Sequence, residues 1–182
     1  MTKLMILIAF MAFGIVSVKS RAQNYSIGTS LTGSALGSIN IEASGATSGS
    51  VSFHLPVMWA PFRFKENIKL KIFAIQPGAR WWFWHVYSGF FAGTYATYAR
   101  FNAGIYNYRH DGFATGISLS TGYSKMLSRK WNIEIELGGG VFYTNYDLFL
   151  NEPCGEYLNS ISEVRLVPSK INISLVYILQ LK

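Results

Sequence analysis

The sequence is poor in cysteine, in charge and in the motifs of the common enzyme classes. Cys154 is the single cysteine among 182 residues, which excludes an intrachain disulfide and any metal site built from several cysteines. Charged residues make up 14% of the chain. There is no G-x-S-x-G, no H-E-x-x-H, no P-loop and no dinucleotide-binding glycine motif. We therefore expect no cofactor, no metal and no enzymatic activity.

Residues 1–22 have the pattern of a secretory signal peptide. Lys3 precedes the uncharged apolar run 4–18, and the small residues Ser20 and Ala22 lie three and one positions before Gln23. The run is shorter than the ~20 residues that a spanning helix needs, so we expect cleavage and a mature domain of residues 23–182. Loss of the three basic residues in this segment lowers the formal net charge from +7 to +4. That charge is too mild to predict nucleic-acid binding.

Along the rest of the chain, apolar residues recur at every second position, which is the period of a β-strand. At residues 171–181 the odd positions are apolar or aromatic and most even positions are polar, with Val176 and Ile178 as exceptions. We expect eight such strands, near residues 24–32, 35–44, 48–59, 68–82, 86–98, 113–127, 130–146 and 168–181. Alternate connections are short, and two of the others, 100–112 and 147–167, are long loops.

An even number of alternating strands with short turns at one end and long loops at the other is typical of an outer-membrane β-barrel. We therefore expect an all-β fold, an eight-stranded antiparallel transmembrane β-barrel in the outer membrane. A soluble sandwich would show the same alternation, but aromatic residues gather near the expected strand ends. The run 80–91 (RWWFWHVYSGFF) would form one interface band, and Trp59, Tyr98 and Tyr143 lie at the opposite ends of their strands.

One alternative concerns residues 81–99, which carry no formal charge and could be taken for a transmembrane helix. Their glycines, threonines and β-forming residues argue against it. The glycines at 138–140 lie within an expected strand and predict a bend or a close approach of strands.

Four ordered segments resemble one known family. They are QPGARWW at 76–82, RKWNIE at 129–134, LGGGV at 137–141 and PSK at 168–170 leading to ISLVY at 173–177. Together they resemble the domain-of-unknown-function family 3575 (DUF3575). That resemblance implies an outer-membrane β-barrel of Bacteroides-like Gram-negative anaerobes, and it implies no reaction. This chain departs from the family pattern at Gly78 and Trp81, where a glutamate and a tyrosine are usual, and its loop around Cys154 is short.

Strand parity assigns five charged side chains to the lumen. If the apolar faces contact lipid, Glu134 and Glu136 point inward, as do Glu42, Arg80 and Lys170, because a charge facing hydrocarbon is costly. Side chains just fill an eight-stranded barrel, so we expect these charges to pair and plug it. Alternatives are an acid–base pair of Glu134 and Glu136, or a gated or ligand-occupied interior. His54 also lies mid-strand and inward.

The first long loop carries an aromatic and basic group, Tyr106, Tyr108, Arg109 and His110. Such a group suits contact with a glycan, with lipopolysaccharide phosphate or with a protein, or simple placement at the interface. His110 beside Asp111 is also the one pair suitably placed for a lipid A-modifying enzyme, although no serine accompanies it.

We expect a structural or interaction role at the cell surface. The expected partners are outer-membrane lipid and an envelope or surface-structure protein or glycan, and no nucleic acid. The alternatives are the lipid A-modifying enzyme and a soluble lipocalin-like carrier, whose apolar faces would point inward around a ligand.

Overall fold

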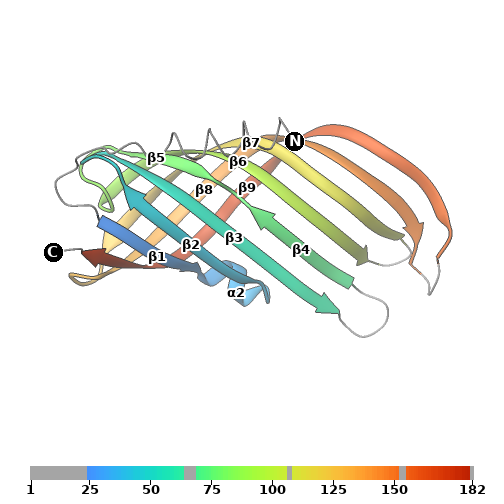
Figure 1. Ribbon diagram of the computed structural model, residues 1–182, viewed down its shortest axis with the longest axis horizontal. Coiled ribbons are helices and arrows are strands. Elements are labelled where there is room, and N and C mark those ends of the chain that lie inside the picture. Colours follow the sequence, from blue (N-terminus) through green and yellow to red (C-terminus); the bar gives the residue numbers. More distant parts are fainter. Residues whose placement is uncertain (1–23, 64–68, 106–107, 152–154, 181–182) are drawn as a thin grey trace, which may run out of the picture.

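The structure is a computed structural model that describes residues 24–63, 69–105, 108–151 and 155–180. Within these residues the chain forms one short helix and nine antiparallel strands in a single sheet that closes on itself (Figure 1). The elements are β1 (Asn24–Ser30), α2 (Leu31–Ala35), β2 (Ile39–Ala46), β3 (Val51–Arg63), β4 (Lys69–Ile75), β5 (Gly78–Trp82), β6 (Gly89–Ile105), β7 (Tyr108–Met126), β8 (Trp131–Leu150) and β9 (Tyr157–Gln180). The predicted signal peptide, Tyr106 and Cys154 lie outside the described residues.

The strands β4 and β5 share one place in the wall. Both pair with β3 on one side and with β6 on the other. They are separated at Gln76 and Pro77, where proline has no N–H to donate to a ladder. The sheet closes because β1 pairs with β9 and β2 pairs with β3. The predicted closed, eight-stranded antiparallel barrel is therefore confirmed.

The helix α2 is a difference from the sequence prediction, which placed strands near residues 24–32 and 35–44. The Ser30 hydroxyl caps this helix by accepting a hydrogen bond from the backbone N–H of Gly33. Asn40 and Asn172 hold the same segment to its neighbours through bonds with Ser30. The wall formed by β1 and β2 consequently ends early, at α2.

The two predicted long loops are wrong. The pairing of β6 with β7 continues to Ile105 and Tyr108, and β8 and β9 pair out to Phe149 and Tyr157. We call the parts of these strands at residues 99–105, 108–114, 142–150 and 157–167 the extension. Figure 1 shows it projecting well beyond β1 and β2. Polar residues occupy both of its faces, which hid its strand character in the sequence.

Side-chain alternation divides the wall into an apolar outside and a polar inside. Exposed large apolar side chains lie outside on every strand of the wall, including Ile117, Leu119, Ile135 and Ile171. The inward positions include serines, glycines, the charged residues of the next section and a few aromatic side chains such as Trp82 and Phe91. Val176 and Ile178, the exceptions noted in the sequence, are buried inside. At the glycine run, where a bend or a close approach of strands was predicted, the register shifts between Gly138 and Gly139, and a Cβ at Gly138 would lie 2.7 Å from the carbonyl oxygen of Leu119.

The aromatic run 80–91 is split between the two sides of the wall. Trp81, Phe83, Trp84 and Phe90 are exposed, as an interface band requires, whereas Trp82 and Phe91 are buried inside the barrel. The prediction that the whole run forms one external band is therefore wrong, because strand alternation turns every second side chain inward. In the described parts of the chain no helix is long and apolar enough to cross a membrane. Residues 81–99 belong to β5, β6 and the turn between them.

Candidate functional site: a charged layer inside the barrel

Arg80 of β5 lies at the centre of the interior and meets three carboxylates. Its Nη1 donates to Glu134 Oε2 at 2.8 Å and its Nη2 donates to Glu136 Oε2 at 2.7 Å, both on β8. The same Nη2 lies 3.0 Å from Glu42 Oε1 on β2, which is separated from β5 by β3. Arg80, Glu134 and Glu136 are each only 1% exposed. A planar guanidinium with five N–H donors suits such a convergent set of acceptors.

Lys170 of β9 is the second cation of this layer. Its Nζ lies 3.3 Å from Glu136 Oε2 and 3.5 Å from the centre of the Tyr95 ring. The Tyr95 hydroxyl accepts a hydrogen bond from Arg80 Nε at 2.6 Å, and Ser120 Oγ donates to the other oxygen of Glu136. Both cations thus have charged and aromatic neighbours that offset the cost of removing them from water.

A chain of hydrogen bonds connects this charged layer to the end of the barrel with the short turns. Glu42 Oε1 lies 2.6 Å from His54 Nδ1, and His54 Nε2 lies 2.7 Å from Ser52 Oγ. Ser52 in turn accepts a hydrogen bond from the indole N–H of Trp82 at 2.8 Å. These hydrogen bonds fix the orientation of Glu42, whose Oε1 contacts both His54 and Arg80.

An aromatic cluster closes the barrel below this chain. Trp82, Tyr87, Phe91 and Ile178 pack together, and the rings of Trp82 and Phe91 lie 4.8 Å apart. Tyr87 enters the interior from the turn between β5 and β6, where its φ is +62°. Its carbonyl oxygen accepts hydrogen bonds from Asn132 and Ser124, and its hydroxyl lies 2.8 Å from that of Ser44. These contacts fill the barrel at its turn end.

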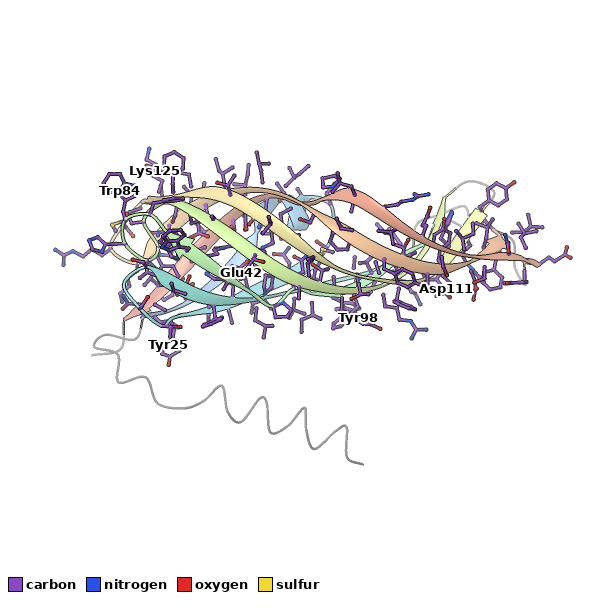
Figure 2. The ribbon with its side chains drawn as sticks, turned by 90° about the horizontal axis from the view of Figure 1, so that it is seen from above. Tyr25, Glu42, Trp84, Tyr98, Asp111 and Lys125 are labelled. Atoms are coloured by element: carbon purple, nitrogen blue, oxygen red, sulfur yellow. The ribbon has the colours of Figure 1, made fainter. Side chains whose placement is uncertain are left out.

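On the opposite side of the charged layer lies a cavity of about 240 Å³ beside α2. Its polar lining includes Glu42, Gln76 and Lys170, with Asn40 and Asn172 near the helix. Figure 2 shows Glu42 midway along the molecule, between the turn end near Trp84 and the extension at Asp111. Glu134 and Glu136 are buried behind Arg80 and do not line the cavity.

This geometry favours a locked interior over a reactive one. Glu134 and Glu136 each have an oxygen bound by Arg80, so neither is placed as a free acid or base facing the cavity. Groups of three or more His, Cys, Asp or Glu side chains suited to a metal ion do not occur within the described residues. The charges of this layer pair with one another and its side chains fill this part of the interior, which is a structural task.

The remaining predicted contact residues lie on a strand of the extension, not on a loop. Tyr108, Arg109 and His110 belong to β7. His110 lies with its ring 5.3 Å from that of Tyr146, whereas Asp111 accepts a hydrogen bond from Asn102. Successive residues of a strand point to opposite faces, so His110 and Asp111 are not brought together as a catalytic pair.

The charged layer also contains residues that the sequence pattern did not assign to it. Tyr95, Ser120 and Ser52 are bonded within it, and His54, expected only to point inward, binds Glu42. Trp82 could have been found, because it shares the parity of Arg80. The contact of His54 with Glu42 could not, because it depends on how β2 and β3 are staggered.

A family model described as a protein of unknown function, DUF3575, matches residues 6–179 of this sequence. No curated protein matches the chain.

Proposed function

The chain belongs to the DUF3575 family, and for this member we propose a small outer-membrane β-barrel with a filled interior and an interaction role at the cell surface. In this proposal residues 1–22 direct export, and the wall of the barrel contacts outer-membrane lipid. The extension meets an envelope or surface-structure protein or glycan. Because the interior is filled, we propose that the protein is neither a diffusion pore nor an enzyme.

One observation carries the proposal: the polarity of the wall is opposite to that of a water-soluble barrel. Ile117 and Leu119 are each 71% exposed, while Arg80 is buried in the interior. An apolar surface that continues over every strand of the wall is rare on a soluble monomer. An apolar belt with aromatic residues at its borders suits a bilayer. Exposed Trp81 and Trp84 at the turn end, with Trp59 and Tyr98 towards the other end, are placed as such borders.

The alternatives fit these positions less well. A lipocalin-like carrier needs apolar side chains around its ligand, but the interior holds Arg80, Lys170 and three carboxylates. A lipid A-modifying enzyme that uses His110 needs an acidic partner beside it, and Asp111 points to the other face of β7. A role that depends on surfaces rather than on a pocket remains.

The test is fractionation of expressing cells, followed by gel electrophoresis of the outer-membrane fraction with and without boiling. We expect the protein in that fraction, and we expect the unboiled band to migrate differently because the closed barrel survives detergent. A soluble protein whose migration does not change would contradict the proposal. An altered lipid A mass spectrum in a deletion strain would support the enzyme instead.

A further inference from the structure

The strand β9 is far longer than the neighbour that borders its outer edge. It runs from Tyr157 to Gln180 and pairs with β8 along most of that length. On its other side β1 covers Ser174–Gln180, and Thr32 of α2 bonds the backbone at Ile171 and Ile173. Among the described residues no strand borders residues 157–167 on that side. The extension therefore ends in a free strand edge.

The backbone groups that face this edge can be identified. The N–H of Ile173 and the carbonyl of Ile171 bond Thr32, so they point away from β8, and backbone groups alternate along a strand. Across the register shift, Phe142 and Thr144 of β8 face Arg165 and Glu163. This leaves the N–H and carbonyl groups of the alternate residues Ser162, Val164 and Leu166 at the free edge, with the carbonyl of Ser160, whose N–H donates to Asn159 Oδ1.

Proline supports this assignment. Pro168 lies at the register shift, opposite Gly139, and prolines within sheets are confined to edges and bulges because they lack a donor. Beyond Pro168, residues 157–167 contain no further proline that would prevent a strand from pairing there. Natural proteins usually protect such edges, and this one continues to the end of the extension.

The side chains along the edge differ between its two faces. On the outer face Leu166 is 81% exposed and Val164 is 66% exposed. On the inner face Glu163 and Arg165 form an ion pair of 2.8 Å, and the Tyr146 hydroxyl donates to Glu163. Next to these charges is a hollow of about 370 Å³ that is also lined by Phe101, His110 and Phe142. A neighbouring strand would thus meet apolar groups outside and polar groups inside.

We propose that the free edge of β9 binds an extended segment of another envelope protein, which adds a strand to the extension. The segment would carry apolar side chains at alternate positions, beside Val164 and Leu166, and polar side chains beside Glu163 and Arg165. Strand addition takes its affinity from backbone hydrogen bonds and its specificity from alternate side chains. Both elements are present at this edge.

A second copy of the chain does not fit this edge, an argument that rests on the proposed membrane location. Two barrels in one membrane are related by an axis along the membrane normal, and barrel strands tilt by ~40°. Such an axis would cross the two β9 strands instead of aligning them, so their backbone groups could not pair. The segment of the chain before β1 joins the barrel at the turn end, opposite the extension (Figure 1).

The experiment is photo-crosslinking in cells of the native host, on the full-length chain. A photo-reactive benzoylphenylalanine is placed at position 166 and, as a control, at position 115 on the outer face of β7, where both edges are paired. Each is combined with Ser162→Pro, which removes one edge-facing N–H, or with Ser162→Ala, which keeps it. Val164→Pro is a second edge variant, in case Ser162→Pro does not fold.

We expect a protein adduct from position 166 but not from position 115. Its yield should persist in Ser162→Ala and fall at least about fivefold with either proline, because a backbone hydrogen bond is lost. An adduct only with lipid or with a second copy, equal yields in all variants, or no adduct would overturn the proposal. Unboiled gels of the same samples test the membrane barrel separately, so failure of one proposal is distinguishable from failure of the other.

Discussion

The closed barrel and the extension are built from the same strands but solve different problems. In the closed barrel every strand has two neighbours, and its interior charges are buried and paired around Arg80. In the extension the sheet is open, and in its ion pair Arg165 is exposed and Glu163 is partly exposed. Charge serves to fill space in the first region and remains accessible to water in the second.

Strand length and wall closure are separate features of this fold. The wall is short where β1, β2 and α2 form it and long where β8 and β9 form it (Figure 1). Closure provides stability where the interior must be sealed, and the longer strands carry an edge beyond it. We expect substitutions in the closed barrel to change folding and substitutions in the extension to change contacts with partners.

The largest difference should come from removing the central cation. We expect Arg80→Ala to lower the free energy of unfolding by about 3–5 kcal/mol, because Glu42, Glu134 and Glu136 would lose their buried partner. Urea unfolding in lipid vesicles measures this change. Arg165→Ala removes an exposed pair in the extension and should cost about 1 kcal/mol or less. A loss of about 1 kcal/mol or less for both variants would show that the interior charges do not hold the barrel together.

The second-largest difference between the two regions should come from placing a charge on the outer face. Leu119 lies midway along β7 and is exposed, and we expect Leu119→Arg to cost about 2–4 kcal/mol if that surface contacts the middle of a bilayer. Leu158→Arg, near the tip of β9, should cost about 0–1 kcal/mol by the same measurement. In detergent-free buffer a soluble protein would instead tolerate both, and that result would contradict the membrane proposal.

Strand parity explains why the charged layer could be predicted from the sequence. A wall that is apolar on one side fixes which residues point inward, so parity alone assigns Glu42, Arg80, Glu134, Glu136 and Lys170 to one interior. Parity does not give the contacts within that interior. The approach of Glu42 to Arg80 depends on the stagger of strands around the closed sheet, which adjacent sequence does not encode.

The extension escaped prediction for a different physical reason. An alternating pattern arises only where the two faces of a sheet meet different environments. In the extension polar residues such as Arg100 and Asn102 directly continue the positions that are apolar in the wall. The stretch therefore resembled a loop, although β6 and β7 pair throughout it. The helix α2 was missed because five residues are too few to show a helical period.

The smallest of the expected effects concerns two glycines of the closed barrel, one on its inner face and one on its exposed outer face. An added Cβ at Gly122, inside the closed barrel, would lie 2.5 Å from the carbonyl oxygen of Ile135 and against the Phe91 ring. Neither neighbour has room to move, so we expect Gly122→Ala to cost about 1–3 kcal/mol through overpacking. At Gly139, where the register shifts towards the extension, the nearest atom would be the carbonyl oxygen of Val167 at 3.7 Å. Gly139→Ala should leave the unfolding free energy nearly unchanged in the same urea titration, and a loss equal to that of Gly122→Ala would mean that the outer face is packed as tightly as the interior.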